Sequence, residues 1–290
     1  MQGPSVGEIL ASRARLSAER RAPTSSWLNR IDASAAFLVQ IGAHDHSSNY
    51  RTQQEPGPTC VAHGWRSLLL EPVPATFERL RQRYELETAR VRLLNAAVCD
   101  AGCQNLSHTM WTVDEKNQTN WGSNESDARC IAAAAPWLRE AASLSARQLL
   151  DLGKWFNHKP KWCHKCSEAL GRKLPPSCMR NVVSANLRDV EVPCRCLHVE
   201  LTREPDVTLL LIDVEGHDLE VLRSFPFERT RTARVIYESV HLSEEGRREA
   251  ARLLLRSGFA NVYGGLARDP MVVWHHLNSS ERLLSITNQR

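Results

Sequence analysis

The sequence lacks any apolar run long enough to cross a membrane. None of its 290 residues belong to a stretch approaching the roughly 20 apolar residues that a transmembrane helix needs. Residues 1–30 contain five arginines but no continuous apolar core, so they do not resemble a secretory signal. These absences predict a chain without a membrane span and favour a cytoplasmic location.

Charge of one sign and aromatic residues are also scarce. The net charge is +4, dispersed along the chain, and aromatic residues make up 6% of the sequence. Nucleic-acid binding requires a concentrated basic surface, often with aromatic side chains on which bases stack. We therefore expect no nucleic-acid partner.

The glycine pattern of a dinucleotide site is missing as well. A single glycine, Gly42, follows the apolar stretch Phe37–Ile41, and Ala-His-Asp-His46 comes next. A pyrophosphate-binding turn needs three glycines in the order Gly-x-Gly-x-x-Gly. The sequence therefore disfavours a nicotinamide-dependent oxidoreductase.

What is present is the pattern of an α/β protein. Short apolar runs at Phe37–Ile41, Ser67–Pro72 and Arg90–Asp100 predict three strands, and a helix face marked by Phe77, Leu80 and Tyr84 lies between the last two. Alternating strands and helices with short connections predict a parallel sheet. Glu71, at the end of the second strand, stands where a carboxylate accepts ribose hydroxyl protons in Rossmann-like folds.

A second group of polar residues follows the buried run Leu209–Ile212. Asp213, Glu215 and His217 come directly after this strand, and His241 follows the next predicted strand. Ligands bind at the carboxyl ends of strands in open parallel sheets, so these four side chains are candidate catalytic residues. The alternative is that the acidic residues stabilise the start of the next helix and that His241 caps the following one.

The last part of the chain predicts an antiparallel edge. Ser243 has the character of an N-cap for a helix that runs to Arg256, with Gly258 as its stop. Two further strands, Phe259–Tyr263 and Met271–Trp274, are separated by a glycine-rich turn. The fold class is thus α/β, with residues 1–34 as an N-terminal helical extension and residues 35–290 as one domain.

An insertion interrupts this domain at about residues 101–190. Thr109–Asp127 is polar and predicts a long loop, and Pro136–Phe156 predicts a helix. A long insertion inside a domain is more often functional than idle, so we interpret it as a cap beside the ligand site.

Cysteines are concentrated in and after the insertion. Cys163, Cys166, Cys178 and Cys194 have the spacing of a structural zinc site, because Cys-x-x-Cys is a good half-site. Two disulfides or free thiols are the alternatives, whereas a redox Cys-x-x-Cys is disfavoured because no thioredoxin-like strand precedes it. The total of nine leaves at least one thiol unpaired.

The compartment stays open at this point. Four Asn-x-Ser/Thr sequons begin at Asn105, Asn117, Asn124 and Asn278. Clustered cysteines and sequons are typical of a secretory or luminal protein, in contrast to the missing signal. The sequence indicates no particular oligomeric state.

Five stretches together carry a resemblance to a known family. They are Val39-Gln-Ile-Gly-Ala-His-Asp45, Gly64-Trp-Arg-Ser-Leu-Leu-Leu-Glu-Pro-Val-Pro-Ala-Thr-Phe77, Asn95-Ala-Ala-Val98, Leu211-Ile-Asp-Val-Glu-Gly-His-Asp-Leu-Glu-Val-Leu222 and Glu238-Ser-Val-His-Leu242. In this order they resemble the FkbM family of S-adenosylmethionine-dependent methyltransferases, over about residues 35 to 275. The cysteine segment and the closing Trp-His-His resemble a branch found in algae and other eukaryotic microbes.

The resemblance implies a Rossmann-like class I sheet of seven strands that binds S-adenosylmethionine. It implies that Gly42 and Ala43 let the methionine part approach, that Asp45 contacts its amino group or orders the loop, and that Glu71 holds the ribose. Ala97 to Asp100 would border the adenine, and Gln40 belongs to the same motif as Gly42. The family usually has a glycine where His46 stands.

The resemblance further implies O-methylation of a hydroxyl on a sugar or a small metabolite. An alcohol acceptor needs its proton removed, and a histidine titrates near neutrality, so His241 is the preferred base and Asp213 the preferred orienting acid. The acceptor is thus a small molecule or a glycan. A methyltransferase-like domain that binds without turnover is the alternative function.

Overall fold

The computed structural model describes residues 28, 31–46, 56–100, 102–103, 107–113, 129–130, 142–147, 149–150, 161–175, 178–204, 206–263 and 271–277. The predicted N-terminal helical extension lies almost entirely outside these residues. In the described part of the chain, no helix is long and apolar enough to cross a membrane.

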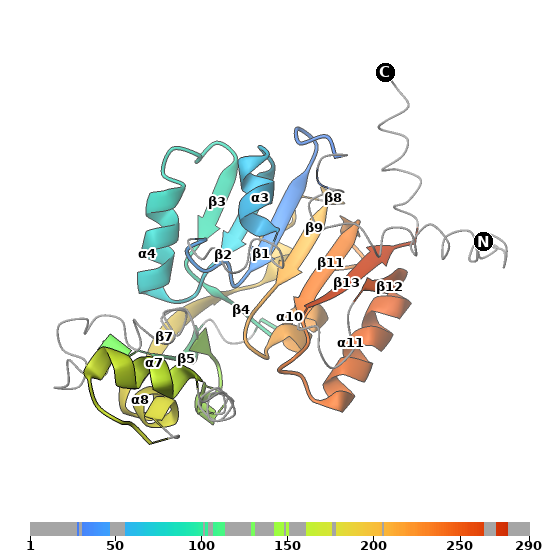
Figure 1. Ribbon diagram of the computed structural model, residues 1–290. Coiled ribbons are helices and arrows are strands. Elements are labelled where there is room, and N and C mark those ends of the chain that lie inside the picture. Colours follow the sequence, from blue (N-terminus) through green and yellow to red (C-terminus); the bar gives the residue numbers. More distant parts are fainter. Residues whose placement is uncertain are drawn as a thin grey trace.

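A seven-stranded sheet forms the centre of the protein (Figure 1). Its strands, from one edge to the other, are β12 (Phe259–Tyr263), β13 (Met271–His276), β11 (Arg234–Glu238), β9 (Leu209–Ile212), β1 (Phe37–Ile41), β2 (Arg66–Leu70) and β3 (Val91–Leu94). The five strands from β11 to β3 pair in parallel, and β13 is antiparallel to both of its neighbours. The predicted α/β fold and its antiparallel edge are confirmed.

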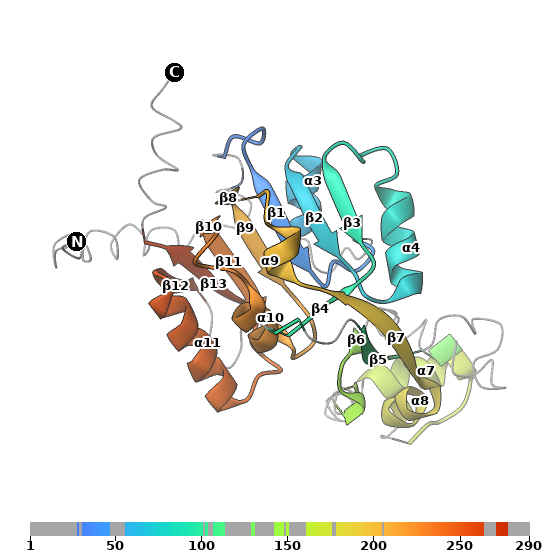
Figure 2. The ribbon, with the colours of Figure 1, turned by 180° about the vertical axis from the view of Figure 1, so that it is seen from behind.

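Helices cover both faces of this sheet because its strands are apolar on both sides. Val39 and Ile41 pack with α9 (Leu197–Glu200), α10 (Asp218–Ser224) and α11 (Glu244–Arg256). Leu38 points to the opposite face and packs with α3 (Gly57–Ala62) and α4 (Pro74–Arg83), as side chains alternate along a strand. Figure 1 shows α3 in front of the sheet, and Figure 2 shows α9 on the reverse side.

Helix α11 has the ends that its sequence predicts. The hydroxyl of Ser243 accepts a hydrogen bond from the backbone N–H of Gly246 at 3.0 Å, which satisfies one donor of the first turn. Gly258, with φ of 85°, follows the last turn. The helix thereby brings the loop before it, which carries His241, to a fixed position at the end of β11.

The insertion forms a second layer of structure with its own small sheet. Its strands lie in the order β4 (Ala97–Val98), β7 (Leu187–Arg195), β5 (Ser107–Val113) and β6 (Ala142–Ser143). Helices α7 (Lys161–Leu170) and α8 (Cys178–Asn186) belong to the same part, and a separate two-stranded sheet joins β8 (Asp206–Val207) to β10 (Arg231–Thr232). In both views the insertion lies beyond the end of the main sheet at which the parallel strands finish (Figures 1 and 2).

The loop predicted at Thr109–Asp127 was wrong at its start, and the helix predicted at Pro136–Phe156 is confirmed only at residues 146–147 and 149–150, which are helical. Residues 109–113 of the predicted loop are part of β5, and residues 142–143 of the predicted helix form β6. The polar pattern of β5 hid the strand, since only two of its seven residues are buried and its partner β7 is about 80 residues away along the chain. The remainder of both predicted segments is largely outside the described residues.

The predicted zinc site of Cys163, Cys166, Cys178 and Cys194 is not formed. Disulfides join Cys163 to Cys178, Cys166 to Cys130 and Cys194 to Cys99. Cys194 lies on β7 and packs with Cys99, apart from the core around α7 and α8 that contains the other three. Sequence spacing suggested the wrong set because the partners Cys99 and Cys130 come from earlier segments.

A fourth disulfide joins Cys103 to Cys196, and Cys60 is left as the free thiol that an odd count requires. Cys60 is a buried residue of α3, and burial raises the pKa of its thiol far above the ordinary value. The structure therefore has the disulfide alternative, with four bridges in place of the two that were expected.

Candidate active site

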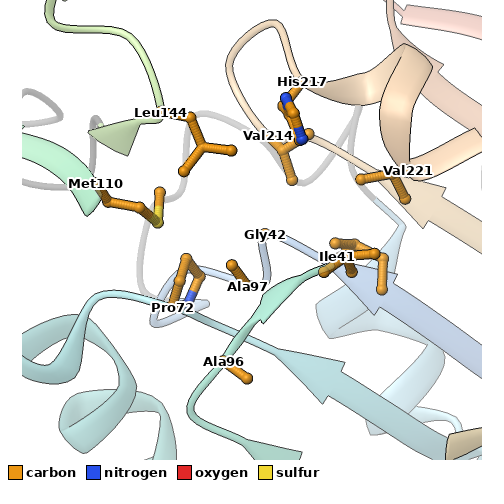
Figure 3. A pocket seen from close by; sticks show the side chains of 11 residues that line it. Ile41, Gly42, Pro72, Ala96, Ala97, Met110, Leu144, Val214, His217 and Val221 are labelled. Atoms are coloured by element: carbon orange, nitrogen blue, oxygen red, sulfur yellow. The ribbon is translucent and has the colours of Figure 1, made fainter. Parts of the chain in front are cut away.

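A crevice opens where β1 and β2 end (Figure 3). It is a small crevice that is partly open to solvent. Its wall is formed by Ile41, Gly42, Pro72, Ala96, Ala97, Val98, Met110, Leu144, Val214, His217 and Val221. The lining is mainly apolar, as is expected for a site that holds a flat aromatic ring.

Gly42, which follows β1, packs directly against the backbone of Asp213, which follows β9. Its φ is 78°, and a Cβ atom added there would lie 1.9 Å from the carbonyl oxygen of Asp213. Only glycine tolerates both conditions. The N–H groups of Gly42 and Ala43 both donate to the carbonyl of Leu70, at 3.0 and 2.9 Å, so the loop continues the pairing of β1 with β2.

Glu71 ties the loops after β1 and β2 together. Its carboxylate accepts hydrogen bonds from the backbone N–H of His44 and of Val73, both at 2.9 Å. Burial raises the pKa of Glu71 to about 7, while the two hydrogen bonds oppose that shift. Each oxygen retains a second lone pair, so the carboxylate keeps the capacity to accept ribose hydroxyls.

Asp45 and Gln40 support the same loop from below. The guanidinium of Arg79, on α4, donates to Asp45 at 2.7 Å. The side chain of Gln40 is fully buried, and its Oε1 atom accepts a hydrogen bond at 3.0 Å from Nε2 of His46. Asp45 thus orders the loop, which is one of the two roles expected for it.

His46 occupies the position at which the family pattern has glycine, and its φ of 56° explains that pattern. Because Oε1 of Gln40 only accepts, Nε2 of His46 carries the hydrogen, and the hydroxyl of Tyr84 donates to Nδ1 at 2.6 Å. Burial lowers the pKa of His46 to about 3, so the ring is neutral. Two hydrogen bonds therefore hold a histidine in a backbone conformation that it rarely adopts.

At the ends of β9 and β11, three titratable side chains converge. Nε2 of His241 lies 3.0 Å from Glu215 and 3.5 Å from Glu238, which ends β11. Burial alone would lower the pKa of His241, but the hydrogen bond to Glu215 and the charges of Glu215 and Asp213 outweigh it and raise the pKa above 6.5. The contact with Glu215 therefore favours the protonated form of the His241 imidazole by raising its pKa.

Asp213 and Asp218 lie beneath this pair. Both are buried, and the carboxylate of Asp218 accepts from the backbone N–H of Gly216 at 3.2 Å and of Glu238 at 3.3 Å. Burial, with the charges of Asp213 and Glu215, raises the pKa of Asp218 well above its ordinary 3.8. Asp218 thus joins the loop after β9 to the end of β11.

His217 differs from His241 in its surroundings. It lines the crevice next to Val214, and burial lowers its pKa below 6.5. Its lowered pKa favours the neutral imidazole at the crevice, whereas the carboxylates around His241 raise the pKa of that ring and favour its protonated form. The structure brings together all four of the candidate catalytic residues, Asp213, Glu215, His217 and His241, at the ends of β9 and β11.

The insertion supplies part of the crevice that the sequence did not reveal. Met110 of β5 and Leu144, next to β6, form its outer wall (Figure 3). The hydroxyl of Ser143 donates to the carbonyl of Glu215 at 3.3 Å, so the insertion also contacts the turn after β9. No motif marks these residues, because their role depends on the pairing of β5 with β6 and β7.

The residues expected to hold a cofactor divide into three groups. Gly42 and Ala97 line the crevice, whereas Gln40, Asp45 and Glu71 are buried and tie the loops after β1 and β2 in place. Ala43 packs in the core between the sheet and α3, and Asp100 lies in an exposed turn after β4.

A seven-stranded sheet in this order, with the crevice at the ends of β1 and β2, defines a Rossmann-like class I methyltransferase fold. The profile of the Methyltransferase FkbM domain matches residues 40–260. The chain belongs to the FkbM methyltransferase family.

Comparison with solved structures gives distant methyltransferases. The METTL16 methyltransferase domain shares 8% identity over 95% of this chain and 70% of its own, with a TM-score of 0.37. Precorrin-6y C5,15-methyltransferase from Geobacter metallireducens shares 13% identity over 90% and 83% of the two chains, with a TM-score of 0.33. The comparison with curated proteins gives no significant match.

Proposed function

We propose that the protein is an S-adenosylmethionine-dependent O-methyltransferase whose acceptor is a hydroxyl of a sugar or a related small molecule. The observation that supports a hydroxyl acceptor is the pair formed by His241 and Glu215, since Glu215 belongs to the turn after β9 whose Val214 and His217 line the crevice. A hydroxyl loses its proton as it is methylated, and this pair provides a place for that proton.

The crevice is suited to S-adenosylmethionine in shape and chemistry. Pro72, Ala97 and Met110 provide apolar surfaces for the adenine, and Glu71 stands directly before Pro72, in the position of a ribose ligand. Gly42 lines the crevice and, without a side chain, lets the loop after β1 pack against the backbone of Asp213. When bound, the cofactor supplies an activated methyl group on a sulfonium.

The protein's own contribution is alignment and proton transfer. Methyl transfer is an in-line displacement, so the insertion and the loop after β9 hold the acceptor oxygen in line with the methyl group. His241, once its proton has moved to solvent, accepts the hydroxyl proton while Glu215 and Asp213 stabilise the resulting imidazolium. His217 is the second base at the crevice and is already neutral.

A polyhydroxylated acceptor agrees with the polar side of the site. Glu215, Glu238 and His241 lie within reach of one another and offer several hydrogen-bond acceptors and one donor. Such a wall binds neighbouring hydroxyls of a sugar, whereas an apolar acceptor would leave these groups desolvated without partners.

The test is methyl transfer from radiolabelled S-adenosylmethionine to a panel of sugars, simple alcohols, thiols and amines. We expect label in a sugar or alcohol fraction, and a loss of about 10²- to 10⁴-fold in His241→Asn. His164→Asn is the matched control, because His164 is an exposed histidine of α7. Binding of S-adenosylmethionine with no transfer to any hydroxyl would favour a binding domain, and label in thiols or amines alone would contradict the proposal.

A further inference from the structure

Two of the four disulfides lie next to each other beside the crevice. Cys99 directly follows β4, and Cys194 is its partner on β7 because β4 and β7 pair with Ala97 opposite Cys194. Cys103 lies in the turn after β4 and is joined to Cys196, which follows the end of β7. Four cysteines from two segments that are more than 90 residues apart therefore meet at one point.

The sulfur atoms of this group are close enough to share one metal ion. The Sγ atoms of Cys99, Cys103 and Cys196 lie within 4.8 Å of one another, and Cys194 is bonded to Cys99. In a tetrahedral zinc site with Zn–S distances of about 2.3 Å, neighbouring sulfurs are about 3.8 Å apart. The backbone positions that allow these two disulfides are thus compatible with a four-thiolate site.

A nearby histidine adds to the donor set. Nδ1 of His198, at the start of α9, lies 3.9 Å from Sγ of Cys103. Imidazole is a common zinc ligand alongside cysteine, and it also serves as a hydrogen-bond partner to a ligating thiolate. Cys99 and Cys194 are buried, whereas Cys103, Cys196 and His198 are accessible, so an ion can enter from the solvent side.

The other two disulfides do not form such a group. Cys130, Cys163, Cys166 and Cys178 share the core around α7 and α8. In the part of the chain that the structure describes, which includes all four, no three of their sulfurs meet the same distance limit. The sulfurs around Cys99 are therefore close enough to share one metal ion, whereas those of the other two disulfides are not.

We propose that Cys99, Cys103, Cys194 and Cys196 bind one Zn²⁺ in a reducing environment and form their two disulfides in an oxidising one. Conversion to the zinc form takes two electrons and two protons per disulfide from a dithiol reductant, which becomes a disulfide itself. The four thiols then release their protons to water as they bind the ion. Either state clamps β4 to β7.

The link that these four cysteines make between β4 and β7 lies next to the wall of the crevice. Ala97 and Val98 of β4 line the crevice directly before Cys99, and Met110 reaches it from β5, which pairs with β7. A link between β4 and β7 therefore keeps both sides of this wall in place. Zinc would allow the same wall to form where disulfides do not persist.

The experiment measures metal in protein expressed with added zinc and purified with a phosphine reductant. We expect about one zinc per chain in the wild type by mass spectrometry, and about a tenth of that or less in the double variant Cys103→Ser/Cys196→Ser. Cys163→Ser/Cys178→Ser is the matched control and should retain the full zinc content. Protein oxidised before exposure to zinc should contain none.

A second measurement uses the wild type alone, so it does not depend on whether a variant folds. Reduced wild type titrated with Co²⁺ should reach its end point at one equivalent, with the visible bands of a tetrahedral thiolate complex. Absence of zinc and of these bands would overturn the proposal, as would loss of zinc in the control pair with retention in the Cys103/Cys196 pair. Neither readout depends on S-adenosylmethionine, so this proposal and the proposed function fail separately.

Discussion

Nε2 of His241 lies 3.0 Å from Oε2 of Glu215, and the two side chains come from loops that follow different strands of the main sheet. The contact joins the turn after β9 to the turn after β11. It makes the charge of His241 depend on a residue 26 positions away in the sequence, and the first prediction follows from this dependence.

Glu215→Gln should lower the pKa of His241. The variant removes the negative charge that raises this pKa, while burial, which lowers it, remains. Titration of the histidine ring signals by NMR gives the value for wild type and variant. An unchanged pKa of His241 in Glu215→Gln would show that the pair does not form in solution. Glu168→Gln is a control at an exposed His164–Glu168 pair, and it should leave His241 unaffected.

The affinity for S-adenosylhomocysteine should rise with pH through about 7. The pKa of Glu71 is raised to about 7, and only its ionised form accepts hydrogen bonds from both ribose hydroxyls. The ionised fraction grows about tenfold between pH 6 and pH 8, and the apparent affinity should follow. Calorimetry at several pH values measures this affinity.

Glu71→Gln should bind S-adenosylhomocysteine at least about tenfold more weakly at pH 8 and lack the rise with pH. Glu78→Gln, on the surface of α4, is the control and should match wild type. A wild-type affinity that is flat across this range would remove Glu71 from the ribose site.

Acid should destabilise the wild type more than His46→Asn. The folded pKa of His46 is about 3 and its unfolded pKa about 6.5, so the unfolded state binds the proton first as the pH falls. Below pH 6.5 the free energy of unfolding of the wild type should therefore fall by up to about 1.4 kcal/mol per pH unit relative to the variant. Asparagine tolerates the positive φ and does not titrate. Urea unfolding at pH 7, 6 and 5 measures the difference, and parallel curves for the two proteins would refute a buried neutral His46.

Gly42→Ala should be far more harmful than Gly171→Ala. Both glycines have positive φ, but an added Cβ meets the carbonyl oxygen of Asp213 at 1.9 Å in the first case and nothing within 4 Å in the second. The conformational cost alone is about 1–2 kcal/mol, which is what Gly171→Ala should lose. Gly42→Ala has to move the loop after β1 away from β9, so its loss in urea unfolding should be clearly larger. Equal losses would mean that the two loops are not packed as described.

The strands of the main sheet could be predicted from the sequence because their own residues already indicate the structure that they form. Phe37–Ile41 and Leu209–Ile212 are short, wholly buried strands, and each is followed directly by a glycine or an acid. Such strands are buried on both faces, so their composition alone identifies them. The helix capped by Ser243 is similarly determined by residues within its first turn.

The insertion could not be predicted in this way. β5 is an antiparallel strand with a mostly polar exposed side, and its partner β7 is remote in sequence, so hydrophobic periodicity is faint. The cysteine pairs likewise join segments 93 and 95 residues apart in two of the four cases. The candidate site was therefore predicted where it depends on strand ends, as for Asp213 and His241, and missed where it depends on Met110 and Leu144.

Calorimetry tests whether the crevice bordered by Gly42, Met110 and Leu144 binds S-adenosylmethionine. We expect one molecule of S-adenosylmethionine or S-adenosylhomocysteine per chain of wild type. Leu144→Trp, which fills the outer part of the crevice, should bind at least about tenfold more weakly, while Leu86→Trp, at a side chain that is 92% exposed, should bind as wild type does. No binding of either compound to folded wild type, or unchanged binding to Leu144→Trp, would contradict this account.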